Sequence, residues 1–245
     1  LSSDERYGLQ KCSVTVGYQL SYPDETISQL SPQECTKLKR EGLYICMIKN
    51  PNPVAKNVTP QLSDAVFIRE KVPMTKEEIR HVSICKLHLK SDSVLYDVGS
   101  GTGSIAVEAA SLSDDMEVYA IEQKENAVQL ITQNKEKHGL ENIHVINAKA
   151  PDGMDNLPVP THAFVGGSGG NLKEIIEALK AKNPHIRIVI NAISMETICE
   201  IKEILSAYDV KNEDIVQLQV SRSKQIGHYH LMQAENPVWI CSFEF

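Results

Sequence analysis

A regular alternation of helix-like and strand-like segments, from about residue 75 to about residue 210, constrains this chain most. The helix-like segments carry apolar residues at helical spacing, and the strand-like ones are short apolar runs such as SVLYDV (93–98). Such alternation is typical of a parallel sheet with helices on both faces. We expect strands over 93–98, 117–121, 143–147, 162–165 and 186–191, and helices from Thr75 and over 103–112, 124–138, 171–182 and 195–206.

The pattern changes after residue 210. Three strand-like runs then follow without a helix between them: DIVQLQV (214–220), HYHLMQA (228–234) and PVWICSFEF (237–245). Consecutive strands of this kind pair as antiparallel neighbours. We therefore predict an α/β fold with a doubly wound, mostly parallel sheet that ends in an antiparallel hairpin.

A proline-rich segment separates this region from a shorter one. Residues 50–60, NPNPVAKNVTP, contain three prolines, so we expect a linker over 51–60. Before it, CSVTVGYQL (12–20) and LYICMI (43–48) are strand-like, and Ser31, Pro32 and Glu34 have the pattern of a capped helix start. Residues 1–50 are too few to bury both faces of such strands. We expect them to be a small α/β fragment of a larger domain, in a chain that begins at Leu1 rather than Met, and 61–245 to be a separate domain.

Charge and composition narrow the function classes. With 25 Lys and Arg against 32 Asp and Glu, the formal net charge is −7, which argues against a broad basic face for nucleic acid. No apolar run has the length needed to cross a membrane, and no signal-peptide pattern is present. The six cysteines lack metal-site spacing, so we expect most of them to be buried core residues in a reducing compartment. These features predict a cytoplasmic protein without a metal.

A glycine-rich loop follows the first predicted strand of the alternating region. It comprises Asp97, Gly99, Ser100, Gly101, Thr102 and Gly103. Glycines there allow a ligand to approach the backbone closely, and we expect the turn to aim amide N–H groups at it. Glu122 ends the next strand, where a carboxylate can accept both hydroxyls of a ribose.

The loop differs from a dinucleotide fingerprint, because Ser104 stands where the third glycine is expected. Its D-x-G-x-G-x-G pattern resembles motif I of class I S-adenosylmethionine (SAM) methyltransferases. That resemblance implies a Rossmann-like fold with SAM as cofactor, the loop wrapping the methionine part and Glu122 holding the ribose. NAD or FAD binding, and a loop without a ligand, remain as alternatives.

A second glycine-rich loop, Gly166, Gly167, Ser168, Gly169 and Gly170, follows the fourth predicted strand of this region. In class I methyltransferases the substrate meets the methyl group there. The N/D-P-P-Y/F sequence typical of enzymes that methylate amide or base nitrogens is absent. Backbone N–H donors of the loop suit an anionic substrate, and a flexible turn is the alternative.

Five segments together resemble one narrower family, the cobalt-precorrin-6B C-15 methyltransferases (decarboxylating) of cobalamin biosynthesis. They are VPMTKEEIR (72–80), YDVGSGTGSIAVEAA (96–110), YAIEQKENAVQLITQN (119–134), HGLENI (138–143) and FVGGSGGNLKEII (164–176). The N-terminal region resembles the end of a precorrin C-5 methyltransferase, a tetrapyrrole methylase domain. The chain would then be part of a precorrin-6Y C-5,15-methyltransferase-like protein without C-5 activity of its own.

The resemblance implies methylation at C-15 of an anionic tetrapyrrole, a precorrin or cobalt-precorrin, with loss of carbon dioxide from the ring-C acetate. It also implies a homo-oligomer and further SAM contacts from Thr75, Gln123, Ala148 and Ala150. The chain departs from the family at Lys149, where an acidic or small residue is usual. Candidates for holding substrate carboxylates are the second glycine loop and the bases Arg69, Lys71, Arg80, Arg222 and Lys224.

No activated Cys or Ser nucleophile is evident, so candidates near the reacting atoms are Gly167, Ser168 and Gly169. His228 and His230 sit two residues apart, and we expect packing rather than acid–base work from them. The rival functions are methylation of another substrate, chiefly tRNA adenine, and an inactive binding domain.

Overall fold

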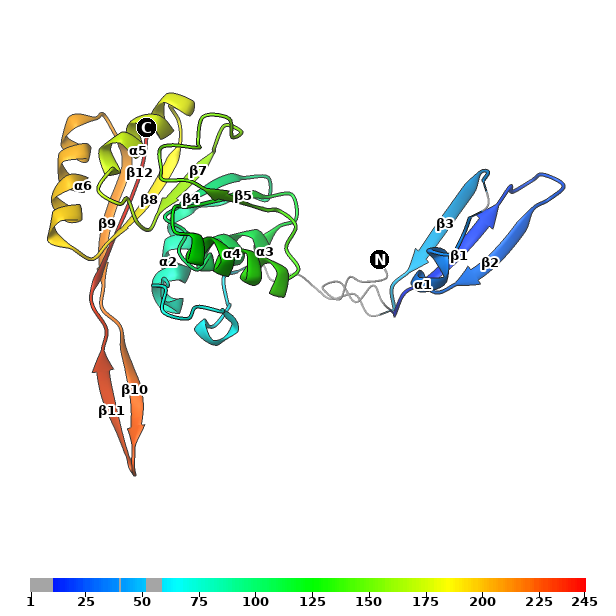
Figure 1. The fold of residues 1–245 in the computed structure, drawn as a ribbon, viewed down its shortest axis with the longest axis horizontal. Coiled ribbons are helices and arrows are strands. Elements are labelled where there is room, and N and C mark those ends of the chain that lie inside the picture. The colour runs from blue at the N-terminus through cyan, green and yellow to red at the C-terminus, as the bar shows by residue number, and fades with distance from the viewer. Residues whose placement is uncertain (1–10, 40, 52–58) are drawn as a thin grey trace. The chain divides into compact units, whose positions relative to one another are not determined.

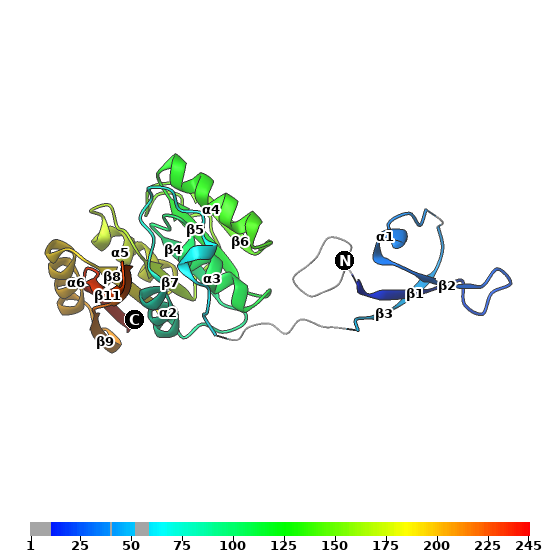
Figure 2. The same cartoon turned by 90° about the horizontal axis from the view of Figure 1, so that it is seen from below.

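The computed structural model describes residues 11–39, 41–51 and 59–245. The chain divides into two compact units, Leu1–Lys56 and Asn57–Phe245, which appear in Figures 1 and 2. Most of the predicted linker, residues 52–58, lies outside the described residues, as do residues 1–10 and 40 of the predicted N-terminal fragment. Within the described part of the chain, no helix has the length and apolar character needed to cross a membrane.

The N-terminal unit is a three-stranded antiparallel sheet with one short helix. Its elements are β1 (Ser13–Tyr18), β2 (Thr26–Leu30), α1 (Pro32–Cys35) and β3 (Tyr44–Lys49), with strand order β2-β1-β3. The capping box at α1 is confirmed, because Glu34 N donates to Ser31 Oγ at 3.3 Å and Ser31 N donates to Glu34 Oε2 at 2.7 Å. The prediction missed β2, whose sequence TISQL is almost wholly exposed and so lacks an apolar signal.

The larger unit contains the predicted doubly wound sheet. Its seven strands run in the order β6-β5-β4-β7-β8-β12-β9, with β4 to β8 parallel and β12 antiparallel to both β8 and β9. The strands are β4 (Val94–Val98), β5 (Glu117–Glu122), β6 (Ile143–Asn147), β7 (His162–Val165), β8 (Arg187–Ala192), β9 (Lys211–Leu218) and β12 (Val238–Glu244). The strand order reverses between β4 and β7, so the loops after these two strands lie side by side, as at the ligand-binding switch point of open α/β sheets.

Helices cover both faces of this sheet (Figure 1). One apolar core includes side chains of α2 (Glu77–Leu87), α3 (Ser104–Leu112) and α4 (Glu125–Lys137), and the other includes α5 (Leu172–Lys182) and α6 (Met195–Ala207). A short 3₁₀ turn, η2 (Asp64–Val66), precedes α2. The α/β fold class is confirmed, and most predicted helix and strand bounds hold within one or two residues.

Between β9 and β12 the chain forms a separate two-stranded ribbon, β10 (Ser221–Ile226) and β11 (Tyr229–Ala234). Figure 1 shows it extending away from the sheet. The sequence predicted β11 but not β10, because SRSKQI is polar. His228 lies in the turn and His230 in β11, so the two histidines do not share a strand face.

Two further expectations were wrong. The helix predicted to begin at Thr75 begins at Glu77. Its N-cap residue Lys76 makes no side-chain capping hydrogen bond, and the Thr75 carbonyl accepts from Arg80. Cys46, Cys85 and Cys199 are exposed, whereas Cys12 and Cys241 are buried. Cys46 lies in an apolar run, but β3 is exposed along its whole length.

Candidate functional site

A cleft of about 850 Å³ opens at the carboxyl ends of the parallel strands. A volume of this size suits a small-molecule ligand site. The predicted residues that line it are Thr75, Gly99, Ser100, Gly101, Glu122, Gln123, Ala148, Ala150, Gly166, Gly167, Ser168 and Gly169. Those that do not line it are Asp97, Thr102, Gly103, Gly170 and the five candidate bases Arg69, Lys71, Arg80, Arg222 and Lys224. Lining residues that the sequence did not single out include Asn191, which exchanges hydrogen bonds with the buried Ser83, and Thr197.

The first glycine loop is held by internal hydrogen bonds. Gly99 N and Ser100 N both donate to Ile121 O, at 2.9 and 3.2 Å, and Gly103 N donates to Ser100 O at 2.9 Å. Gly101 N donates to Glu122 Oε2 at 3.0 Å. These amides are therefore engaged within the protein, and the expectation that they point at a ligand was wrong for them. The glycines of the loop instead allow a ligand to approach the backbone closely, because they have no side chain.

Asp97 supports this loop from below. Its side chain is almost fully buried, and Ser100 Oγ donates to Oδ2 at 2.6 Å. Oδ1 has no well-formed hydrogen bond among the described residues. Burial raises the pKa of Asp97 to about 7, against the opposing effect of hydrogen bonds from Ser100 and the amide of Ala106. Asp97 therefore positions the loop through Ser100 and does not itself line the cleft.

Glu122 joins two turns at the end of β5. Besides Gly101 N, its carboxylate accepts from Lys124 N at 2.9 Å through Oε1. Only 8% of the residue's surface is exposed, yet it lines the cleft. Each carboxylate oxygen has more than one lone-pair site, so both can still accept from a ligand hydroxyl.

The two glycine loops touch. A Cβ on Gly99 would stand 2.8 Å from Gly167 N and closer still to Gly167 O, and Gly166 N donates to Val98 O at 2.9 Å. Only backbone without a side chain can approach this closely. The contact places the surface expected for the methyl donor directly beside the surface expected for the acceptor.

The second glycine loop is open where the first is packed. Residues Gly166, Gly167, Gly169 and Gly170 are exposed. No atom of the described residues lies within 4 Å of a Cβ added at Gly167 or Gly170. Gly169 and Gly170 have φ of 58° and 84°. Asn171 anchors the end of this loop by donating from Nδ2 to Ala150 O at 3.3 Å.

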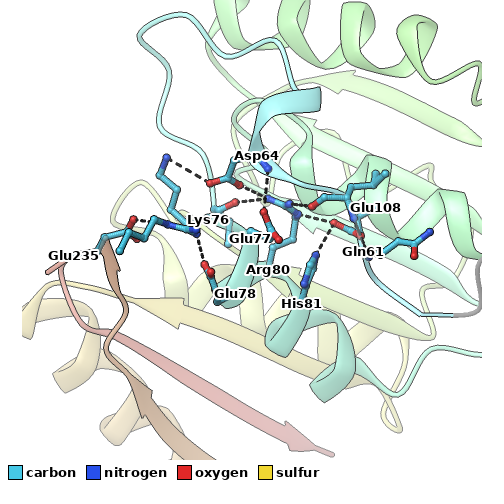
Figure 3. Close-up of polar contacts among 12 residues, drawn as sticks. Gln61, Asp64, Lys76, Glu77, Glu78, Arg80, His81, Glu108 and Glu235 are labelled. Atoms are coloured by element: carbon cyan, nitrogen blue, oxygen red, sulfur yellow. Dashed lines mark hydrogen bonds and ion pairs between the residues drawn. The ribbon is translucent and has the colours of Figure 1, made fainter. Parts of the chain in front are cut away.

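Residues 72–76 form one rim of the cleft, and Arg80 fixes them. Its guanidinium is fully buried and donates from Nε to Glu108 Oε2 at 2.6 Å and from Nη1 to Thr75 O at 2.8 Å. It also bonds Asp64 Oδ1 at 3.0 Å and the Leu62 carbonyl (Figure 3). The candidate role of Arg80 in holding substrate carboxylates was therefore wrong, because its charge is neutralised inside the fold.

The bases near the cleft differ from those expected. Arg222 forms ion pairs with Glu78 and, at 3.1 Å, with Glu235 (Figure 3), and Lys224 is exposed on the ribbon. The structure does not bring either side chain into the cleft. The basic residues that line it are Lys76, Lys124 and Lys149. Among the described residues, no group of three or more His, Cys, Asp or Glu could hold a metal ion.

Solved structures of other proteins superpose on the larger unit and identify its fold class. The structure of precorrin-6y C5,15-methyltransferase from Geobacter metallireducens superposes with a TM-score of 0.72 at 31% identity, over 78% of this chain and all of that one. A Methanobacterium thermoautotrophicum structure described as precorrin 8w decarboxylase gives 0.70 at 32% identity, over 74% of this chain and 98% of that one. The larger unit is thus a class I methyltransferase fold.

Sequence comparison narrows the class to a family. A family model described as the precorrin methyltransferase domain matches residues 65–244. A Pyrobaculum calidifontis protein named as a probable cobalt-precorrin-6B C(15)-methyltransferase (decarboxylating) is 38% identical over 185 residues, which are 74% of this chain and 94% of that protein. The chain belongs to the precorrin methyltransferase family.

Proposed function

We propose that this chain methylates C-15 of a precorrin-6B-type tetrapyrrole, with or without cobalt, and releases the ring-C acetate carboxyl as carbon dioxide. The observation that carries the proposal is the backbone contact between Gly99 and Gly167, because it sets a donor surface against an acceptor surface. The activity named for the relatives supports the same reaction.

SAM is the proposed methyl donor, and the cleft fits it. The backbone of Gly99, Ser100 and Gly101 offers the close approach that the methionine part requires, and Glu122 retains acceptor capacity for the ribose hydroxyls. Gln123, Ala148 and Ala150 line the same cleft beyond Glu122 and are proposed to flank the adenine. Thr75 lies on the rim that Arg80 fixes.

Bound SAM supplies an electrophilic methyl carbon on a positively charged sulfur. Gly99, Gly101 and Glu122 would hold SAM so that its methyl group could pass to the tetrapyrrole carbon beside the second glycine loop, with the electron pair of the broken S–CH₃ bond left on sulfur. In the decarboxylation, the C–C bond to the carboxylate breaks and its electrons pass into the conjugated macrocycle, where a proton later replaces the lost group. The protein aligns the two reactants, and positioning of this kind can supply about 7–11 kcal/mol of the barrier.

The direct test is to incubate the protein with SAM and cobalt-precorrin-6B and to measure the product mass. A product that has gained one methyl and lost carbon dioxide supports the proposal. An unchanged macrocycle, together with methylation of an added tRNA, would replace it with the tRNA rival.

A homo-oligomer is the proposed working form, and the ribbon supports it. Every residue of β10 and β11 is exposed, including the large apolar Ile226, Tyr229, Leu231 and Met232. A lone two-stranded ribbon is marginally stable in water, so packing against another copy would stabilise it. Light scattering should give a mass above one chain, and Leu231→Ser with Met232→Ser should lower it; a monomeric wild type would contradict this.

The N-terminal unit is proposed to be the end of a tetrapyrrole methylase domain. Its small sheet leaves Ile27, Ile45 and Met47 more than 60% exposed, which supports a missing neighbour. Hydrogen exchange tests this, because an incomplete domain should exchange fast. Uniformly strong protection across the described residues 11–39 and 41–49 would contradict the proposal.

A further inference from the structure

The cleft contains three lysines whose surroundings differ. Lys76 forms an ion pair with Asp64 at 3.6 Å, so part of its charge is already balanced. Lys124 is the N-cap residue of α4, and its side chain makes no capping hydrogen bond there. Lys149 lines the cleft, is exposed and forms no ion pair or hydrogen bond through its ammonium group in the described part of the chain. Lys149 therefore offers a cation that the fold itself does not use.

The position of Lys149 links it to the acceptor side of the cleft. Its Cε lies 3.8 Å from the point where a Cβ on Gly169 would stand, and Gln123 Nε2 lies 3.4 Å from the same point. Gly169 belongs to the open loop that faces the proposed acceptor, and an alanine there would meet both side chains. Lys149 and Gln123 thus flank the second glycine loop on one side.

The ammonium group of Lys149 suits an anionic ligand. Lysine has three donors and no acceptor, so Lys149 cannot accept a hydrogen bond from the adenine amino group. A carboxylate is acceptor-only and charged, and a charge-assisted hydrogen bond to it is stronger than a neutral one. The unpaired lysine beside the acceptor loop matches a carboxylate of the substrate.

We infer that Lys149 is a substrate-binding residue that holds one carboxylate side chain of the macrocycle beside the second glycine loop. The inference rests on the proposed function and extends it. In this inference the main anion contact is Lys149, which lines the cleft, and not the predicted Arg222 and Lys224, which do not. Lys149 takes no part in bond making or breaking.

The experiment measures binding of two probes to the 245-residue chain and its variants by titration calorimetry. The probes are S-adenosylhomocysteine for the donor site and cobalt-precorrin-6B, added to the S-adenosylhomocysteine complex, for the acceptor site. Lys149→Met removes the charge and keeps the stem, and Lys149→Arg keeps the charge. Lys202→Met is the matched control, because Lys202 is exposed on α6, away from the cleft, and its loss changes net charge equally.

For Lys149→Met, we expect the Kd of cobalt-precorrin-6B to rise about tenfold, which corresponds to about 1.4 kcal/mol. The Kd of S-adenosylhomocysteine should stay within about twofold, and Lys149→Arg and Lys202→Met should stay near wild type. Raising the ionic strength should weaken corrinoid binding less in Lys149→Met than in wild type, because one screened charge is gone.

Corrinoid binding at wild-type strength in Lys149→Met would overturn the inference while leaving the proposed function intact. Equal weakening of both probes would overturn it too, because Lys149 would then belong to the donor site. A wild-type protein that binds S-adenosylhomocysteine but neither binds nor methylates cobalt-precorrin-6B would instead overturn the proposed function, on which the inference depends.

Discussion

The two glycine-rich loops lie in contact, yet they use glycine for different reasons. In the first loop, hydrogen bonds to Ile121 O and Glu122 engage the amides, and a side chain at Gly99 would collide with the neighbouring backbone. In the second loop, Gly167 and Gly170 face open space. Glycine in the first loop therefore serves packing within the protein, whereas in the second it leaves room for a ligand. Substitutions should separate these two uses.

Gly99→Ala should have the largest effect. The new Cβ would collide with the Gly167 backbone, and Gly99 has φ of 70°. Overpacking and left-handed strain together should lower the free energy of unfolding by about 3 kcal/mol. Urea unfolding measures the loss, and calorimetry should detect no S-adenosylhomocysteine binding.

The matched control is Gly167→Ala, on the other side of the same contact. An added Cβ there meets no atom within 4 Å in the part of the chain that the structure describes, so stability should change by less than about 0.5 kcal/mol. Turnover of the tetrapyrrole should nevertheless fall, because the methyl group would occupy acceptor space. Equal destabilisation by both variants would remove the distinction between the loops.

Glu122→Ala should come next. It removes two acceptors for backbone amides and the proposed ribose contact, so we expect S-adenosylhomocysteine binding to weaken about 10–100-fold. Glu125→Ala is the control, since Glu125 starts the next helix, carries the same charge and accepts a hydrogen bond from Asn147 at 2.7 Å. Wild-type affinity in Glu122→Ala would exclude the ribose role.

Asp97→Asn should change how stability depends on pH. Burial raises the pKa of Asp97 from its ordinary 3.8 to about 7, so the unfolded chain loses this proton before the folded one. The contribution of Asp97 to stability therefore falls as pH rises from about 4 to about 7. Asparagine cannot ionise, so the stability of the variant relative to wild type should increase across that window in urea unfolding.

Gly170→Ala should lower stability slightly and leave ligand binding almost unchanged. Its φ of 84° disfavours a side chain although the space is open, and we expect a loss of about 1 kcal/mol in urea unfolding. Binding of S-adenosylhomocysteine should remain within twofold of wild type. A loss as large as that of Gly99→Ala would mean that the second loop is packed as tightly as the first.

Local patterns predicted most of the fold and much of the site. Elements such as β4 and α3 carry their own apolar periodicity, and the glycine loops follow strands that the pattern identifies. The strands β2 and β10 were not predicted, because they bury few side chains and so have no apolar pattern. The roles of Arg80 and Arg222 were predicted wrongly for another reason. A charge looks the same in a sequence whether it faces a ligand or a partner such as Glu108 or Glu78, and only the folded chain supplies that partner.

The buried guanidinium of Arg80 also decides where this domain can be cut for separate expression. The family match starts at residue 65, but Gln61 N and Leu62 N donate to Glu108 Oε1 at 2.6 and 2.8 Å, and the Leu62 carbonyl accepts from Arg80. A fragment that starts at residue 65 would lose these bonds and Asp64, and removing one partner of a buried ion pair typically costs about 3–5 kcal/mol. Residues 61–64 therefore belong to the folded domain, and a fragment made for separate expression should include them.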